Sequence, residues 1–491
     1  MIFALVAFMP MQESLRAFEH GHYLQAARYA FSAAQDNERQ QSEGYARVTE
    51  SLVREGMPYM ATYFFIRTLQ SGNRQSTQKV LRELPALLRG VGSEFLKPFL
   101  LKYTQYEDYN DRASLAAWMF IAGKSAMLHE DYEKAIMHFG NAIHAPDLEA
   151  ESLFLRGTAQ VLVGRLHEGV RDFEACRDRA QGAASAALSR DTKTPGDSHG
   201  SARFAQQGQE LKERCQAALG RALYELESFD QAANVFQMID KKSIVWPEIL
   251  FEEAWTAYRR SMFGQSLGKL MSYRSPLLAF IYNPEIGVLR AQAHLALCHY
   301  QDAMQEIKLF EQQMTPLGSS IRHALESHEH DLPFFASLGK QALMMNRDPF
   351  MQMLGSVVRS PYYQRLSVGE SRIQHELQHA RTLGTHGFVG FLQEVGHFFT
   401  ESLHAFEGIL VKNTLVDYNA ELIENFDKMS FMKVEVLKVA SDSLQNIKPA
   451  VGVNMRTPSI PTSMLYWTFN GEFWSDELGD YVVATTSACA H

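Results

Sequence analysis

A spacing of 34 residues recurs along this chain and limits its possible folds more than any single residue does. Each copy opens on a small residue, and these residues are Gly123, Gly157, Gly220 and Ala254. Large apolar residues follow after nine and after sixteen positions, and another small residue lies between them. The large residues are Tyr132, Leu166, Phe229 and Phe263, then Phe139, Phe173, Phe236 and Leu270, and the small ones are Ala135, Gly169, Ala232 and Ser266. A helix–turn–helix unit of this length cannot bury its apolar face alone, so the spacing predicts an all-α solenoid of stacked units.

The repeat resembles the tetratricopeptide repeat. In the clearest unit, residues 116–147, the family's signature positions hold Gly123, Tyr132, Ala135, Phe139, Ala142 and Pro146. Further units are placed at 20–34, 45–70, 79–103, 153–176, 218–239, 246–273 and 289–310. The resemblance implies a tetratricopeptide-type superhelical solenoid of about eight units over residues 11–315. It also implies that the first helices of the units line a concave binding face.

An insertion separates the second and third strong repeats. Residues 177–207 are small and polar and contain Gly and Pro, which predicts a flexible inserted loop. Cys176 and Cys215 bracket this segment, and two alternatives stay open for them. They could form a disulfide that closes the loop in an oxidising compartment, or they could be two buried thiols in the core.

Beyond the repeats, residues 319–447 are predicted to form a helical domain with a long, coiled-coil-like hairpin. Apolar residues recur there at steps of three and four, which is typical of a packing seam. They are Leu415, Tyr418, Leu422, Phe426 and Met429. A Pro-containing linker at 448–464 leads to an aromatic C-terminal segment at 465–491. Asn470–Gly471 within that segment predicts a short strand pair.

The aromatic segment is the second candidate binding site, after the concave face of the repeats. Its predicted anchors are Trp467, Phe473, Trp474 and Tyr481, and its predicted polar contacts are Glu472, Asp476 and Glu477. Clustered aromatic residues at a surface mark interaction sites. The alternative is an intramolecular clasp, in which the tail folds back and caps the helical hairpin.

A possible zinc motif lies in the helical region. His375, Glu376 and His379 satisfy H-E-x-x-H, in which two histidines bind zinc and the glutamate is the general base. The expected third ligand is missing nearby, and Ile373 and Leu377 give the helix an apolar stripe on another side. A packed helix with a solvated polar face is therefore expected. His328, His330 and Asp331 form a second possible metal cluster, for which a solvated loop is the favoured interpretation.

Charge and hydropathy narrow the classes of partner. The net charge of −9 argues against nucleic acid, which needs a basic surface. The sequence contains no apolar run of about 18 residues, so no transmembrane helix is predicted. Residues 1–10 begin with a short apolar run that fits either the core of a signal peptide or the first helix of the solenoid.

The layout of repeats, helical hairpin and aromatic tail with a late cysteine resembles large exported tetratricopeptide proteins of gliding and predatory delta-proteobacteria. The resemblance implies a non-catalytic, periplasmic or envelope-associated scaffold without a cofactor, whose partners are envelope or motility proteins. Two alternatives remain, namely a zinc-dependent peptidase that uses residues 375–379 and a cytoplasmic adaptor that binds peptides.

Overall fold

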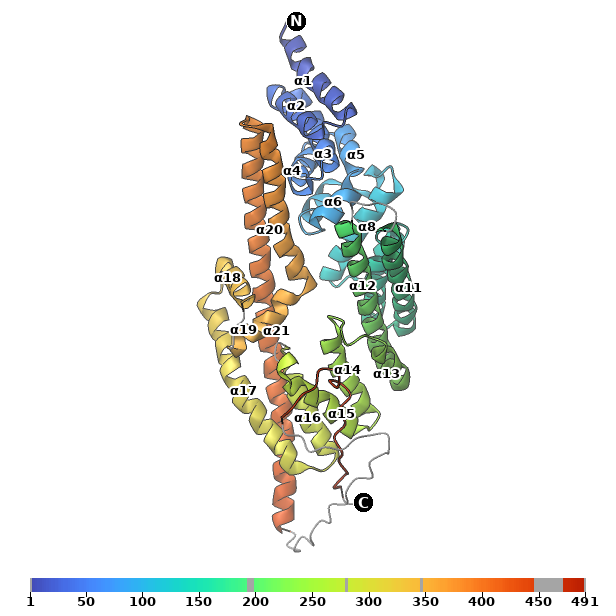
Figure 1. Cartoon of the computed structure of the whole chain (residues 1–491), viewed down its shortest axis with the longest axis vertical. Helices are drawn as coiled ribbons and strands as arrows, with labels where there is room; N and C mark the ends of the chain where they lie inside the picture. Colours follow the sequence, from blue (N-terminus) through green and yellow to red (C-terminus); the bar gives the residue numbers. More distant parts are fainter. Residues whose placement is uncertain (1, 192–197, 279–280, 345–347, 446–470, 490–491) are drawn as a thin grey trace. The chain divides into compact units, whose positions relative to one another are not determined.

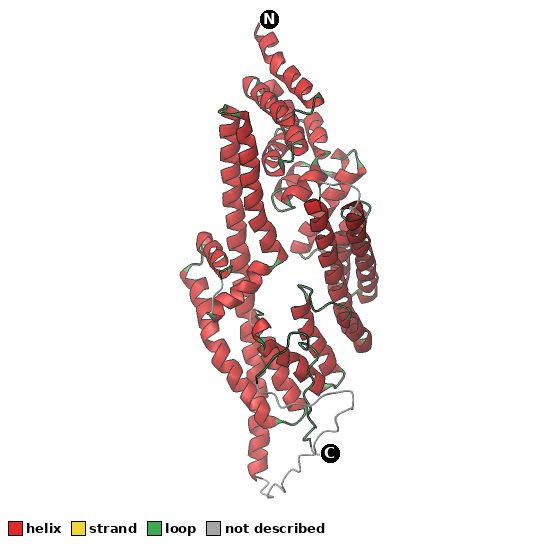
Figure 2. Cartoon of the chain, in the orientation of Figure 1, coloured by secondary structure: helices red, strands yellow, loops and turns green. Residues whose placement is uncertain are grey.

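The computed structural model describes residues 2–191, 198–278, 281–344, 348–445 and 471–489. Among these residues the regular structure is entirely helical, and no strand is present (Figure 2). The all-α fold predicted from the sequence is therefore confirmed. No helix within the described ranges is long and apolar enough to cross a membrane.

The repeats form eight successive helix pairs within the described residues (Figure 1). The first four are α1 (Ile2–Glu19) with α2 (Tyr23–Asp36), α3 (Glu38–Arg54) with α4 (Pro58–Gln70), α5 (Arg74–Leu81) with α6 (Leu84–Val91), and α8 (Arg112–Leu128) with α9 (Tyr132–Ala142). The last four are α10 (Glu149–Leu162) with α11 (Leu166–Asp191), α12 (Ser198–Glu225) with α13 (Phe229–Gln237), α14 (Trp246–Arg259) with α15 (Phe263–Met271), and α16 (Glu285–Ala296) with α17 (Tyr300–Ser327). Shorter helices, α7 (Lys97–Tyr103), η1 (Tyr106–Asp108), η2 (Ser272–Arg274) and η3 (Pro276–Leu278), lie between pairs.

A left-handed residue reverses the chain within most of these pairs. Seven of the pairs have a positive φ at their turn, at Gly21, Gly56, Glu130, Gly164, Glu227, Ser261 and Cys298. Four of these positions are not glycine, although a side chain is disfavoured in this conformation. The turn geometry therefore recurs even where its usual residue is absent, which marks the pairs as copies of one unit.

The small and aromatic residues of the 34-residue pattern meet inside the pairs. A Cβ atom built on Gly123 would lie 2.7 Å from the ring of Phe139, and one on Gly157 would lie 2.9 Å from Phe173. In the pair α14–α15 the small residue is Ala254, and the residue that packs with it is the smaller Leu270. An added methyl group on the first helix is thus accompanied by a smaller side chain on the second.

We expect Gly123→Ala to destabilise the protein by about 1–2 kcal/mol. The buried Phe139 ring must move, and this overpacking exceeds the gain in helix propensity. Chemical denaturation followed by circular dichroism measures the loss. Adding Phe139→Leu should make the double variant more stable than the sum of the single effects predicts. Gly182→Ala is the matched control, since nothing lies within 4 Å of its added Cβ. Equal effects at the two glycines would contradict the packing account.

The prediction of a flexible loop at 177–207 is wrong for its described residues. α11 continues to Asp191, and α12 begins at Ser198. The inserted sequence Ala-Ala-Ser-Ala-Ala-Leu at 183–188 has high intrinsic helix propensity, so the insertion lengthens two helices. Cys176 and Cys215 are fully buried and joined by a disulfide, with their Cα atoms 5.9 Å apart.

Contacts divide the chain into two compact units, and each combines repeats with part of the C-terminal helices. Unit 1 comprises residues 1–215 and 365–404, and unit 2 comprises residues 216–364 and 405–491. The C-terminal helices are α18 (Leu332–Ala342), α19 (Pro349–Arg359), α20 (Pro361–Ala380), η4 (Arg381–Leu383) and α21 (Gly387–Gln445). The region 319–447 is therefore shared between both units and does not pack as a separate domain.

Within unit 1, the start of α21 packs against N-terminal repeats. The ring of Phe388 lies 5.0 Å from that of Phe31 in α2, and Phe399 lies 5.8 Å from Tyr59 in α4. Within unit 2, the predicted seam of α21 is in place. Leu415, Leu422 and Met429 are buried in one core with residues of α16, α17, α18 and α19. The seam thus packs against repeat and connecting helices.

Candidate interaction site formed by the C-terminal tail

The described part of the tail, residues 471–489, folds back onto the repeats of unit 2. It contains turns at 475–480 and then an extended, non-helical segment. No strand forms in these residues, so the predicted strand pair is not present in the part of the tail that the structure describes. The tail folds back on its own chain, as the clasp interpretation expected, and its described residues bond to α15 and to the turn between α16 and α17.

Leu478 and Gly479 anchor the tail. Leu478 is 4% exposed. The Gly479 N–H donates to the buried hydroxyl of Ser272 at 2.8 Å. Gly479 has a φ of +86°, and a Cβ there would lie 2.9 Å from the Trp246 ring. Both the backbone conformation and the close contact therefore require glycine at this position.

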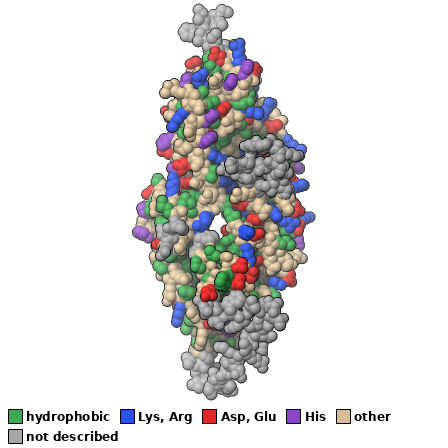
Figure 3. Space-filling model, in the orientation of Figure 1, with side chains coloured by type: hydrophobic (Ala, Val, Ile, Leu, Met, Phe, Trp, Pro, Cys, Tyr) green, Lys and Arg blue, Asp and Glu red, His purple; other side chains and the backbone are tan. Residues whose placement is uncertain are grey.

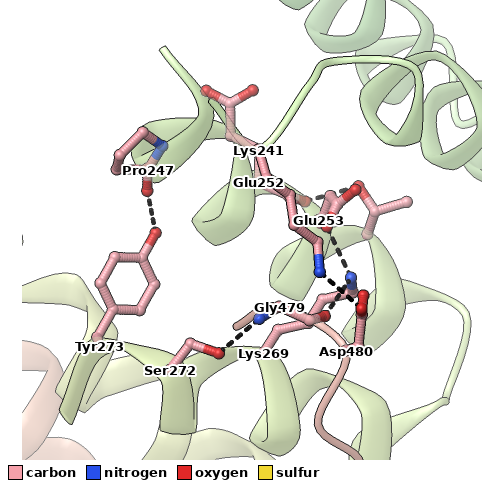
Figure 4. A network of polar contacts seen from close by, with 10 residues as sticks. Lys241, Pro247, Glu252, Glu253, Lys269, Ser272, Tyr273, Gly479 and Asp480 are labelled. Atoms are coloured by element: carbon pink, nitrogen blue, oxygen red, sulfur yellow. Dashed lines mark hydrogen bonds and ion pairs between the residues drawn. The ribbon is translucent and has the colours of Figure 1, made fainter. Parts of the chain in front are cut away.

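An ion pair between the two helices of a repeat supplies a donor to the tail. In α10–α11 the first helix carries the cation, where Arg156 bonds Asp172 at 2.6–2.7 Å. In α14–α15 the order is reversed, and Lys269 of the second helix donates to Glu253 at 2.6 Å. The same ammonium group donates to the Gly479 carbonyl at 3.2 Å (Figure 4). A carboxylate at position 269 could not donate to this carbonyl, so the reversal suits the tail.

A second lysine, Lys241, binds the turn at 475–480. Lys241, in the connection between α13 and α14, donates to the Asp480 carboxylate at 2.6 Å and to the Asp476 carbonyl at 2.8 Å. Figure 4 shows Lys241 and Asp480 beside the Lys269 contacts. The Lys241–Asp480 pair is solvent-exposed, so it orients the turn more than it stabilises it.

The extended segment lies against glycines of α15. The Val483 N–H donates to the Gly264 carbonyl at 2.9 Å, and a Cβ on Gly268 would collide with the Tyr481 carbonyl. Further on, the Ala488 N–H donates to the Leu297 carbonyl at 2.9 Å. A disulfide between Cys298 and Cys489, which the sequence did not suggest, then joins the tail to the α16–α17 turn.

The predicted binding residues occupy different environments. Trp474 is 59% exposed, and Glu472 and Asp476 are exposed beside it. Phe473 and Tyr481 are half-buried, with ring centroids 6.3 Å apart, and the Tyr481 hydroxyl accepts the backbone N–H of Trp474 at 3.2 Å. Figure 3 shows acidic side chains beside hydrophobic ones in the lower half of the view. Glu477 is half-buried, and Trp467 lies outside the described residues.

Sequence reasoning missed the residues that hold the tail in place. Leu478, Gly479 and Asp480 make the anchoring contacts, whereas the aromatic residues drew attention by their number. The Leu-Gly-Asp sequence carried a usable signal, because Gly followed by Asp predicts a left-handed turn position. Their partners Lys241 and Lys269 lie more than 200 residues away, so the sequence gives no hint of the pairing.

We expect Gly268→Ala to loosen the tail, because the new methyl group occupies the place of the Tyr481 carbonyl. Chymotrypsin should then cut after Tyr481 about tenfold faster or more, since cleavage of a docked segment needs local opening. The fragment is visible only after reduction, because the Cys298–Cys489 disulfide retains it. Gly182→Ala is again the control, and unchanged cleavage in Gly268→Ala would contradict the docking described for α15.

The H-E-x-x-H segment forms a structural contact in unit 1. Glu376 is 2% exposed, and its two carboxyl oxygens accept the N–H groups of Tyr59 and Met60 at 3.2 and 3.0 Å, at the start of α4. His379 pairs with Glu55 at 2.6 Å, and His375 is exposed. The carboxyl group caps a helix and both of its oxygens are occupied by backbone donors, so this arrangement does not match a peptidase centre.

Burial raises the pKa of Glu376 to about 8, against the opposing effects of the two N–H donors and Arg372. The folded-state pKa thus exceeds the unfolded value of about 4.3. Between these two pH values Glu376 is protonated in the folded protein and ionised in the unfolded chain. Its contribution to the free energy of unfolding is therefore complete below about pH 4 and is lost as the pH rises to about 8.

We therefore expect the wild-type free energy of unfolding to fall by about 1 kcal/mol per pH unit over this range relative to Glu376→Gln. At pH 5 the free energy of unfolding of Glu376→Gln should be about 1 kcal/mol below that of wild type, because the amide nitrogen of Gln cannot accept the second N–H. Urea denaturation at pH 5, 6, 7 and 8 measures both effects. Glu394→Gln, an exposed change on α21, is the control. Parallel pH curves for wild type and Glu376→Gln would contradict this account.

The second possible metal cluster is also accounted for by structural contacts. The His328 ring stacks on Phe334 at 3.5 Å, and the Asp331 carboxylate accepts the Phe334 N–H at the start of α18. His330 is exposed. These contacts agree with the solvated-loop interpretation of the segment.

A second apolar surface runs along α21 in unit 2. Ile409, Val416 and Ile423 are exposed at steps of seven residues, and Leu437 continues the same register. Steps of seven are typical of a helix face that receives another helix. These exposed residues are distinct from the buried seam of Leu415 and Leu422. They offer a docking surface for a partner that is an alternative to the C-terminal tail.

Comparisons with known proteins give weak likenesses. The crystal structure of the P58(IPK) TPR domain is 11% identical over 81% of this chain and 98% of that chain, with a TM-score of 0.20. A circular tandem repeat protein with a novel repeat topology is 13% identical over 88% and 91%, with a TM-score of 0.15. No protein-family profile and no curated protein sequence matches the chain.

These TM-scores are too low to support an argument, so the class rests on the chain's own geometry. Paired helices, left-handed turn residues and packing of small residues against large apolar ones recur along the chain. They define an all-α helical-repeat fold, in keeping with the resemblance of the sequence to the tetratricopeptide repeat.

Proposed function

We propose that this chain is a non-catalytic scaffold for protein–protein interaction, and that the turn at 472–480 is its docking element. The observation that carries the proposal is the exposure of Trp474 on a turn that hydrogen bonds at residues 476–480 hold on unit 2. Tryptophan gains most by entering a pocket on a partner, and it is enriched at the centres of interfaces. A turn fixed beforehand loses little conformational entropy on binding.

The surroundings of Trp474 define the chemistry of the partner. Glu472 and Asp476 are exposed beside it, while Asp480 is paired with Lys241. A matching surface would have an apolar pocket for the indole ring and a basic rim for the two carboxylates. Such a partner is a protein, because the acidic turn repels the phosphates of nucleic acid.

We expect Trp474→Ala to lower capture of the crosslinked partner from native cells by about tenfold or more, which corresponds to a hot spot of about 1.4 kcal/mol or more. Quantitative mass spectrometry measures the captured protein. Tyr106→Ala is the matched control, an aromatic residue in unit 1 that is 52% exposed. Loss of the partner with Ile423→Lys and not with Trp474→Ala would move the docking surface to α21 and overturn the proposal.

We further propose that the scaffold is exported and works in the cell envelope, with envelope or motility proteins as partners. Support comes from the resemblance drawn from the sequence and from the pairing of all four cysteines, Cys176 with Cys215 and Cys298 with Cys489. Disulfides persist in oxidising compartments and are rare in the cytosol.

The two cellular locations make opposite predictions for the thiols. Protein trapped from cells by acid quenching should show no thiol that reacts before reduction and four after it. Four reactive thiols in the trapped protein, together with cytoplasmic fractionation, would favour the cytoplasmic peptide-binding adaptor. The zinc peptidase alternative is not supported, because the Glu376 carboxyl group is occupied by backbone donors.

A further inference from the structure

Three potential metal ligands converge at the turn between α16 and α17. His294 lies in the last turn of α16, His299 immediately precedes α17, and Asp302 lies in its first turn. One ligand atom from each residue lies within 4.8 Å of the others. The left-handed residue Cys298 reverses the chain between the histidines, so the turn itself brings the three together.

The tail fixes the hydrogen position on His299. Its Nε2 lies 2.9 Å from the Thr486 carbonyl oxygen, which can only accept, so Nε2 carries the hydrogen. In the neutral ring Nδ1 then holds a lone pair. This atom lies 3.9 Å from the Asp302 carboxylate, which is also an acceptor. In the neutral ring both atoms are therefore acceptors, and a cation between them would satisfy both.

His294 supplies the third lone pair. Its Nδ1 is buried, and no residue in the described part of the chain is hydrogen-bonded to it. The neighbouring carboxylate of Glu306 is already bonded to Arg274 and Arg290, and this leaves it out of the ligand set.

We propose that His294, His299 and Asp302 bind a divalent transition-metal ion, with zinc the best match. Two imidazole nitrogens and one carboxylate oxygen leave the fourth tetrahedral position to water. Zinc bonds of about 2.0–2.2 Å place two ligand atoms about 3.3 Å apart, so the site must contract slightly. Asp302 is exposed and free to make that movement by rotating.

The Thr486 carbonyl has the role of an outer partner that orients a metal-binding histidine. The metal would therefore connect α16, α17 and the tail at the point where the Cys298–Cys489 disulfide also joins them. This assignment concerns the inner side of the tail and is independent of whether Trp474 binds a partner.

The test is metal titration of the untagged full-length protein. Wild type should bind one Zn²⁺ in calorimetry, and Co²⁺ at the same site should give the visible absorption of a tetrahedral ion. His294→Gln and Asp302→Asn should each weaken Zn²⁺ binding about tenfold or more. His328→Gln is the matched control, since His328 faces Asp331 at 3.6 Å in a similar turn but stacks on Phe334. It should leave zinc affinity unchanged.

Zinc affinity that is equal in wild type and Asp302→Asn, or that falls equally in His328→Gln, would overturn the assignment. Circular dichroism checks that each variant is folded. If His294→Gln loses helix content, Asp302→Asn decides alone, because an exposed side chain of the same size is exchanged there. Stoichiometry well above one with no effect of either variant would indicate scattered surface histidines and would also contradict the proposal.

Discussion

The contact between a small residue of one helix and a large apolar residue of the next sets the geometry of each repeat. Gly123 meets Phe139, and Gly157 meets Phe173, so close that an added Cβ has no room. This contact fixes the distance between the two helices of a pair. Because it recurs with the same spacing, each pair presents similar faces to the next, and stacking follows. The α14–α15 pair, on which the tail docks, is built on the same contact through Ala254 and Leu270.

Docking of the tail needs departures from that regularity. Gly264 and Gly268 remove side chains from α15 where the tail backbone approaches. The reversed Glu253–Lys269 pair then places a donor toward the tail, where α10–α11 has an acidic residue on the second helix. Small changes within one repeat thus create a binding surface for an extended chain, while the packing between Ala254 and Leu270 continues the common pattern.

The sequence predicted the repeated helix pairs and missed the contacts between residues that lie far apart in the chain. Periodicity located the strong helix pairs, because a small residue and a large apolar one sixteen positions apart meet within one unit. The unit placed at 79–103 is wrong, since it begins inside α5 and ends in α7. The prediction also failed at 177–207, where small residues suggested a loop although alanine favours helix. The capping role of Glu376 was not predicted, since no local pattern reveals that its carboxyl group caps a helix more than 300 residues away. The same limit hid the partners of Leu478, Gly479 and Asp480.

The central claim is that the tail is held on unit 2 by main-chain hydrogen bonds and is not a free arm. Hydrogen–deuterium exchange of the Val483 and Ala488 amides in the oxidised protein tests it most directly, because each donates to a repeat carbonyl at 2.9 Å. The account predicts exchange about 100-fold slower or more than in an unstructured peptide, consistent with a closed state favoured by several kcal/mol. Exchange of both amides at the unstructured rate, with the Cys298–Cys489 disulfide intact, would contradict it.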